Sequence, residues 1–369
     1  EVVRVLQRNC LGCHRPGGVA PMSLATYEEA RPWAKAIKEE LLEKRMPPGG
    51  VVKGFGDFRN SFPITQREID LIVNWVEGGA PAGKPDLLPP GKLYSDDWTL
   101  GKPDIVLKPR TSQSVSSDTD DYREIVLPVK RKGTISIRAI DLRPEKRSVV
   151  HCATFYVIND DRKPGGSASP AAEGRRRILG TWAPGQAPFQ LPDGTNFALS
   201  AGSDVIARIH YRGSGEATKD RSEIGLYLSD TAGRQVSELR PNGNLEVVMT
   251  GSRAESRSTT VLSEDLEALA ILPPQSDPKV LSLQVTAYRP DGTPEILLWA
   301  TATQFDWQPT LVWKNPVSLP KGTALEVLAY SNNVGPQITT PQQGFRPLVL
   351  FVTSVGGGGK VEPAQAHRQ

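Results

Sequence analysis

The segment Cys10-Leu11-Gly12-Cys13-His14 constrains the fold of this chain more than any other feature. Two thiols three positions apart, followed directly by an imidazole, form the attachment pattern of a c-type haem. The thiols add to the two vinyl groups, and the histidine supplies one axial iron ligand. A CxxC that binds zinc or does redox chemistry would need two further ligands or a βαβ context, and neither surrounds this segment. We therefore expect one covalently bound haem c.

A second axial ligand must come from elsewhere in the chain, and the three methionines Met22, Met46 and Met249 are the candidates. Met22 lies eight residues after His14, in a Pro- and Gly-rich loop that must leave the haem on the histidine side. Met46 follows a helical stretch and precedes Pro47-Pro48, which stops a helix and stiffens the loop after it. We predict that Met46 is the distal ligand; the alternative is that each methionine belongs only to the apolar core.

Two helical stretches are predicted around this segment, at about 26–45 and 65–77. Each begins with a capping box, in which a threonine and a glutamate three positions later satisfy each other's backbone N–H groups: Thr26 with Glu29, and Thr65 with Glu68. Pro32 should kink or split the first helix, because proline cannot donate its backbone hydrogen bond. The second stretch carries an apolar face and ends at Gly78-Gly79.

The large remainder of the chain has the pattern of a β protein. Residues 81–105 contain many Pro, Gly and Asp residues, which indicates a linker. Beyond them, short apolar or alternating runs such as DVIARIHY and ALEVLAY stand between turn signals, which is typical of strands. Two β-sandwiches fit the available length.

Composition narrows the class of partner and the cellular compartment. The 44 basic and 41 acidic side chains form no long run of one sign, so the sequence has no electrostatic footprint for nucleic acid. No apolar stretch is long enough for a membrane span. The chain starts at Glu1, nine residues before Cys10, which fits a mature form whose targeting segment has been removed. We expect a location in the periplasm or otherwise outside the bacterial cytoplasmic membrane, with membrane association only through a partner.

Within residues 1–85 the segments CHRPGGVAPMSL, WAKAI, RMPP and TQREIDLIVNWVEGGAP resemble the bacterial cytochrome c domain that is often fused to copper-monooxygenase-like domains. This resemblance implies haem on Cys10 and Cys13, with His14 and Met46 as axial ligands. The implied fold is a small all-α domain of the class I type.

The resemblance continues over most of residues 95–345, through SVVHCATFYV, GTWAPG, LPDGT and GSDVIARIHYRGSGEATKDRSEIGLYL. These motifs resemble the ascorbate-dependent type II copper monooxygenases, the group that includes peptidylglycine α-hydroxylating monooxygenase and dopamine β-monooxygenase. That family implies two all-β jelly-roll sandwiches side by side and two copper sites.

The copper ligands implied by this family are only partly present. The family holds one copper by a His-His pair and a further histidine, and the pair here is His151-Cys152. His210 matches a copper-ligand position of the family, but the match does not identify which of the two coppers this histidine would bind. Gln275 and Asp277 stand where we would look for histidines of the oxygen-activating copper, and no methionine follows Met249. Because a site without imidazole and thioether ligands holds Cu(I) poorly, we predict that the sandwiches lack monooxygenase activity.

Cys152 has no cysteine partner for a disulfide, so it is either a small buried residue or a ligand. Of the four histidines, His14 is assigned to haem and His367 lies in the tail. His151 and His210 leave two interpretations open. They are buried, hydrogen-bonded relics, or they form with Cys152 a single site for copper in electron transfer or for zinc.

The sequence thus predicts an exported monohaem c-type cytochrome for single-electron transfer, a subunit or docking partner of a larger redox complex. Its partner would be a redox protein or a membrane electron-transfer complex, and the sandwiches would act as scaffold. A haem-fed copper monooxygenase and a mainly structural subunit of a membrane redox complex are the alternatives. The predicted divisions are a cytochrome c domain at 1–85, a linker at 86–105, sandwiches at 106–231 and 232–355, and a flexible tail at 356–369.

Overall fold

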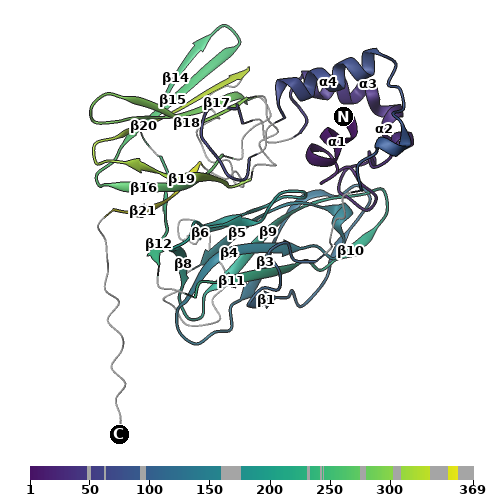
Figure 1. Cartoon of the computed structure of the whole chain (residues 1–369). Coiled ribbons are helices and arrows are strands. Elements are labelled where there is room, and N and C mark those ends of the chain that lie inside the picture. The colour runs from purple at the N-terminus through teal and green to yellow at the C-terminus, as the bar shows by residue number, and fades with distance from the viewer. Residues whose placement is uncertain are drawn as a thin grey trace.

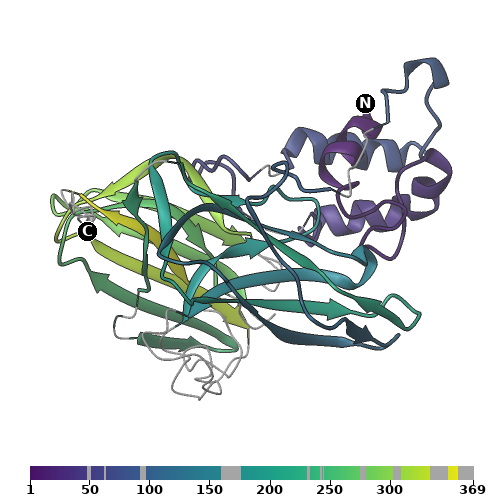
Figure 2. The ribbon, with the colours of Figure 1, turned by 90° about the horizontal axis from the view of Figure 1, so that it is seen from below.

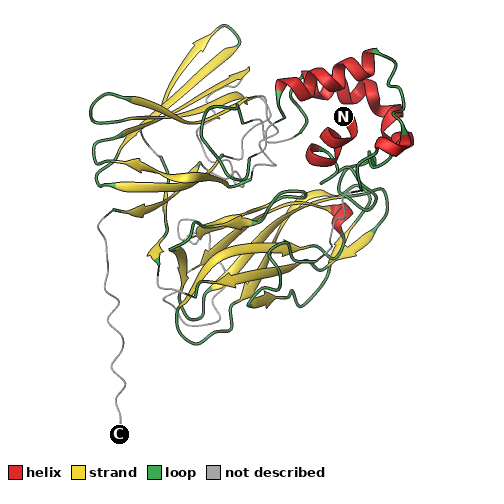
Figure 3. Cartoon of the chain, viewed as in Figure 1, coloured by secondary structure: helices red, strands yellow, loops and turns green. Residues whose placement is uncertain are grey.

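The protein is mainly β, with short helices at its N-terminus and several antiparallel sheets (Figures 1 and 3). This computed structural model describes residues 1–47, 51–61, 64–91, 97–158, 176–230, 233–241, 243, 245–274, 280–301, 309–332 and 348–355. The expectation of a helical N-terminal part followed by a large β region is confirmed. No helix in these ranges is long and apolar enough to cross a membrane.

The helical part contains four α-helices: α1 Val2–Asn9, α2 Tyr27–Ala30, α3 Ala34–Leu42 and α4 Gln66–Glu77. The 3-10 turn Arg31–Trp33 separates α2 from α3, so the predicted split at Pro32 is confirmed. Both predicted capping boxes are present. Helix α1 was not predicted, and it buries Val5 and Leu6 against the other helices. A further 3-10 turn, Pro85–Leu87, follows α4.

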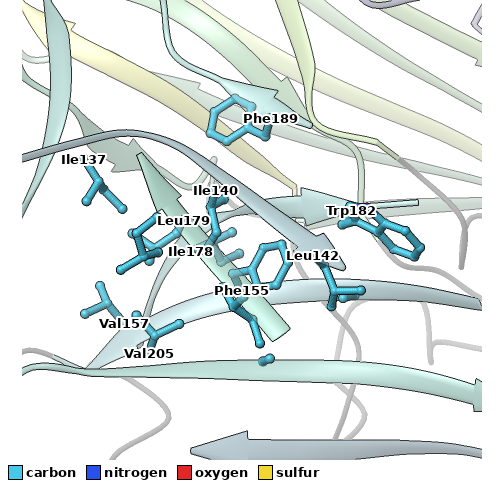
Figure 4. Close-up of a cluster of buried hydrophobic side chains, with 14 of the residues drawn as sticks. Ile137, Ile140, Leu142, Phe155, Val157, Ile178, Leu179, Trp182, Phe189 and Val205 are labelled. Atoms are coloured by element: carbon cyan, nitrogen blue, oxygen red, sulfur yellow. The ribbon is translucent and has the colours of Figure 1, made fainter. Parts of the chain in front are cut away.

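The first sandwich consists of two facing sheets and a short third one. One sheet has the order β1-β11-β4-β8-β12, with β7 on β4, and the other has the order β3-β9-β5-β6. The strands are β1 Ile105–Leu107, β2 Gln113–Val115, β3 Asp120–Pro128, β4 Ile135–Arg143, β5 Val150–Ile158, β6 Arg176–Trp182, β7 Phe189–Gln190, β8 Thr195–Leu199, β9 Asp204–Arg212, β10 Thr218–Asp220, β11 Glu223–Leu228 and β12 Arg234–Gln235. Side chains such as Ile140, Phe155 and Ile178 from β4, β5 and β6 meet in the core (Figure 4).

The second sandwich pairs the sheet β14-β15-β20-β17-β18 with the sheet β13-β21-β16-β19. Its strands are β13 Ser237–Leu239, β14 Leu245–Thr250, β15 Arg253–Val261, β16 Leu266–Leu272, β17 Val280–Tyr288, β18 Pro294–Thr301, β19 Leu311–Leu319, β20 Ala324–Asn332 and β21 Val349–Ser354. The chain passes into it directly after β12, which still pairs with β8 of the first sandwich.

Strands β16 and β21, in the middle of the sheet β13-β21-β16-β19, are buried on both faces. Ile271 and Leu350 belong to the core of the second sandwich, whereas Leu272 and Phe351 belong to the core of the first. The Phe351 ring lies 5.3 Å from that of Phe189 in β7. A strand with apolar neighbours on both faces needs a continuous apolar run, and β16 has one in ALAIL, residues 268–272. The two sandwiches therefore pack against each other through an apolar interface.

The helical part is bound to both sandwiches, at one end of the pair (Figures 1 and 2). Residues 51–61, between α3 and α4, run along the second sandwich, where Val51 bridges Ala300 and Phe58 bridges Trp313. The Arg59 N–H donates to the Val312 carbonyl over 2.8 Å. This segment therefore adds backbone pairs and the Phe58 ring to the second sandwich, and it fixes where the helices lie.

Candidate functional site

The Cys10–His14 segment forms the turn that follows α1. Cys10 is the C-cap of the helix, and its carbonyl accepts the backbone N–H groups of Cys13 at 3.1 Å and His14 at 2.9 Å. None of the three cysteines forms a disulfide. Cys10 packs against the apolar cluster of the helical part, which includes Leu11 and Ile72. A planar apolar group attached at Cys10 would therefore meet an apolar surface.

His14 is oriented by the backbone of the loop that follows it. Its Nδ1 lies 3.2 Å from the carbonyl oxygen of Met22. In the neutral ring Nδ1–H donates this hydrogen bond, so the lone pair lies on Nε2. Histidines that ligate metals are oriented in this way by a hydrogen bond from the other ring nitrogen. The donor set of two free thiols and an oriented imidazole therefore fits a covalently attached haem c.

Burial strongly affects the two thiols of this segment. Desolvation raises the pKa of Cys10 to about 12 and that of Cys13 to about 11. Burial also lowers the pKa of His14, partly opposed by the hydrogen bond to Met22. A reactive CxxC pair needs a thiolate with a lowered pKa. The two thiols therefore lack the electrostatic environment of a dithiol redox centre.

The two candidate distal methionines lie in different places. The Met22 carbonyl binds Nδ1 of His14, so the backbone of this residue lies behind the imidazole, away from Nε2. Met22 also packs against the helical core. Met46 lies in the loop after α3, where its backbone N–H donates to the Glu40 carbonyl, and it is 37% exposed. Met46 as the distal ligand stays a prediction.

The structure brings His151, Cys152 and His210 together. One ligand atom of each lies within 4.8 Å of the others. His151 and Cys152 are consecutive in β5, and consecutive residues of a regular strand point to opposite faces. The pairing of β5 with β9 shifts between Val150, which opposes Tyr211, and Cys152, which opposes His210. This β-bulge at His151 lets two consecutive side chains reach the same site.

The geometry of this cluster is set by strand pairing. The rings of His151 and His210 are nearly perpendicular, and their Nδ1 atoms are 3.1 Å apart. His210 Nε2 lies 2.6 Å from Oδ1 of Asp120 in β3. Tyr122, which directly opposes His210, stacks on it with ring centroids 4.3 Å apart. The two imidazoles are only 6% and 5% exposed, and Cys152 is partly buried.

Burial and charge favour particular protonation states in the cluster. Desolvation, followed by the nearby His210 and Arg212, lowers the pKa of His151 to about 3, so this ring is neutral near pH 7. The hydrogen bond to His210 holds the pKa of Asp120 below its usual value, so the carboxylate accepts the Nε2–H of His210. With its Nε2 held by Asp120, His210 directs Nδ1 at His151.

Two chemical states fit this arrangement. Without a metal, His151 donates its Nδ1–H to Nδ1 of His210. If a metal were bound, the two Nδ1 atoms would serve as ligands, and the His151 proton would lie on Nε2 instead. Nitrogens bound to one ion at about 2.0–2.1 Å lie about 3.3 Å apart in tetrahedral geometry, which is close to the separation of the two Nδ1 atoms. The residues therefore fit a small metal ion.

The haem-attachment segment touches the loop that follows β6. The Cys13 thiol donates to the Pro184 carbonyl over 3.4 Å. A Cβ on Gly12 would lie 2.8 Å from the Cα of Gly185, so the two backbones meet there. In the sheet, β6 pairs with β5, and Trp182 opposes Ala153, the residue after Cys152. The loop 183–186 thus starts beside the metal-ligand cluster and ends against the haem segment.

Several residues of the site follow only from the fold. Asp120 and Tyr122 reach His210 through the pairing of β3 with β9, and no local sequence signal marks them. The contact of Pro184 with Cys13 is also invisible in sequence. Gln275, Asp277 and His367 lie outside the described residues, so the predicted loss of the second copper site stays a prediction.

Comparison with known proteins finds no match to a family model and none to a curated protein. Distant structural likeness exists to PNGF-II, with 10% identity, a TM-score of 0.28 and coverage of 68% of this chain and 65% of that one. N-glycanase F (PNGase F) has 10% identity, a TM-score of 0.25 and coverage of 68% and 95%. A tandem CBM22 domain of Paenibacillus barcinonensis Xyn10C has 11% identity, a TM-score of 0.17 and coverage of 66% and 86%. This chain thus spans slightly less than two thirds of PNGF-II, and none of these values carries an argument about function.

Proposed function

We propose that this protein is a single-electron carrier that holds one haem c on Cys10 and Cys13, with His14 as the proximal ligand. One observation carries the proposal: the Met22 carbonyl orients His14 by Nδ1, within an attachment segment of two free thiols at an apolar core. When bound, the haem supplies a one-electron Fe(II)/Fe(III) couple. The chain fixes the haem, orients the imidazole and packs apolar side chains around the segment.

Met46 is our proposed distal ligand. The Met22 carbonyl binds Nδ1 of His14, so the Met22 backbone lies on the side of the imidazole away from Nε2, which argues against that residue. Met46 follows α3, and Met46 N–H donates to the Glu40 carbonyl, so this loop stays attached to the helical part. A methionine ligand would favour a higher potential than a second histidine.

In this proposal the helical part is a class I-like cytochrome c domain, and the sandwiches are jelly rolls related to the copper monooxygenases but without their activity. They serve as the scaffold that presents the haem to a redox protein or a membrane electron-transfer complex outside the cytoplasmic membrane. The apolar contact between the sandwiches and the pairing of residues 51–61 with the second one support a scaffold role, because both give the helices a fixed position.

One observation favours a second candidate, a haem-fed copper monooxygenase. The His151, Cys152 and His210 cluster lies beside the loop that touches the haem segment. Hydroxylation would require a second copper that activates oxygen. Gln275 and Asp277 offer no imidazole for such a site, so we rank this candidate below electron transfer.

A redox titration of the purified holoprotein tests the proposal. We expect one haem per chain and a single one-electron transition in the visible spectrum. Replacing both Cys10 and Cys13 with alanine should abolish covalent haem, whereas Cys152→Ala, the matched control, should retain it. A wild-type protein without haem, or a haem that does not change oxidation state reversibly, would contradict the proposed function.

A further inference from the structure

We infer that His151, Cys152 and His210 bind one copper ion, and that the loop 183–186 couples this site to the haem-attachment segment for exchange of single electrons. The inference rests on the proposed function, and it names the redox partner of the haem as a site within the same chain.

The geometry and the burial of the cluster are typical of a metal site. The β-bulge at His151 turns two consecutive side chains to the same place, although a regular strand would separate them. Each imidazole presents Nδ1 to the other at 3.1 Å. His210 is oriented from its other nitrogen by the Asp120 carboxylate, the arrangement that fixes the tautomer and raises the basicity of a metal-ligating histidine. Both rings are buried, so an ion there would be shielded from water.

The donor set favours copper over zinc. Two imidazoles and one thiolate are three ligands, and structural zinc sites take four protein ligands. A His2Cys set is the trigonal arrangement of electron-transfer copper sites, in which the fourth ligand is weak or distant. Among the described residues the structure groups only these three histidine and cysteine side chains as a candidate site. A three-ligand copper site therefore fits the cluster without a further residue.

The loop 183–186 connects the cluster to the helical part over a short path. Trp182 opposes Ala153 in the sheet, and Pro184, two residues later, accepts the Cys13 thiol at 3.4 Å. The path runs from Cys13 through Pro184 and Trp182 to Ala153 and Cys152. Standard spacings between consecutive Cα atoms and between paired strands give it a length of about 23 Å, which is an upper limit on the distance from the Cys13 sulfur to the Cys152 Cα. When Cys13 carries haem, its sulfur is no longer a donor, but the backbone contact between Gly12 and Gly185 remains available.

The proposed exchange is a balanced one-electron step. Ferrous haem gives one electron to Cu(II), which yields ferric haem and Cu(I), and the reverse step restores both. Neither direction needs oxygen, a proton or a substrate. The function of the first sandwich would then be to hold a second redox centre, in addition to serving as a scaffold.

Copper titration of the ferric holoprotein tests the site itself. We expect one equivalent of Cu(II) to bind and to produce an intense visible charge-transfer band from the Cys152 thiolate. Cys152→Ser should lose the band, and His210→Ala should weaken copper binding. Met249→Ala should change neither, because Met249 is exposed on β14, away from the cluster. Absence of the band in the wild-type protein, or tight binding of zinc with no binding of copper, would overturn the inference.

Electron exchange is tested on the ferric holoprotein already loaded with one equivalent of Cu(II): a pulse of light in the presence of a photoreductant reduces the haem by one electron, and both bands are followed afterwards. Loss of the ferrous haem spectrum and of the copper band should proceed together, one to one, at a rate that does not depend on protein concentration. Gly185→Ala should slow this reaction and leave both spectra intact, because its Cβ would lie 2.8 Å from the Gly12 Cα.

Gly202→Ala is the matched control. Gly202 has φ +78°, close to the +75° of Gly185, but no atom lies within 4 Å of its Cβ position. Both variants therefore carry similar backbone strain, and only one disturbs the contact. Equal rates in the two variants, or a rate that rises with protein concentration, would overturn the coupling. A protein that carries haem and copper without exchange would contradict this inference alone, whereas a protein without haem would contradict the proposed function.

Discussion

Replacing Phe58 with alanine tests whether residues 51–61 hold the helical part on the second sandwich. The Phe58 ring is 5% exposed and packs on Trp313 with centroids 5.4 Å apart, and the two residues also form a backbone bridge. Removing a buried phenylalanine ring costs about 3–5 kcal/mol, because the contacts are lost and a cavity remains. We expect the free energy of unfolding to fall by this amount.

The assay is urea unfolding of the holoprotein, followed by tryptophan fluorescence and by haem absorbance. Phe55→Ala is the matched control, since this half-buried ring meets Trp299 edge-on at 4.9 Å. Its loss should cost about 1–2 kcal/mol, from less buried area and one aromatic pair. If Phe58→Ala cost no more than Phe55→Ala, segment 51–61 would not be an anchor, and our account of how the helices are positioned would be wrong.

Three further predictions concern the two metal sites and the pH dependence of stability. Met46→Ala should lose the weak near-infrared band of methionine-sulfur ligation and lower the reduction potential of the haem, whereas Met22→Ala should change neither. The reverse result would identify Met22 as the ligand. Asp120→Asn should weaken copper binding about 10–100-fold and shift the copper band, because the carboxylate that orients His210 is lost. Unchanged copper binding would show that Asp120 does not orient a copper ligand. Burial raises the pKa of Asp141 from 3.8 to about 6, so the folded state binds a proton there that the unfolded state has released. Stability should therefore fall by about 2 kcal/mol as pH rises from 4 to 6, with the fall reduced in Asp141→Asn. An equal fall in both proteins would contradict this assignment.

Features that depend on neighbours in sequence could be predicted. The capping boxes at Thr26 and Thr65 are local, and both are present. Pro32 splits the first helical stretch because it lacks a backbone N–H, which is a property of one residue. Helix α1 was missed because it is short and its apolar positions, such as Val5 and Leu6, extend over little more than two turns.

Features that depend on pairing between distant segments could not be predicted. The bulge at His151 exists only in the register of β5 against β9. Asp120 is 90 residues from His210 in sequence, and the pairing of β3 with β9 brings them together. The pairing of residues 51–61 with β18 and β19 also joins distant parts of the chain, so the contact of this segment with the second sandwich could not be predicted. His151 and His210 were identified by residue type, but their geometry required the sheet.

Covalent attachment of haem at Cys10 and Cys13 is the central claim, and the intact mass of the purified protein tests it most directly. After extraction with acidified acetone, the polypeptide should keep the mass of one haem, and tryptic peptides should locate it on the segment that contains both cysteines. Recovery of the bare polypeptide mass, with the haem in the acetone phase or with no haem at all, would contradict the account.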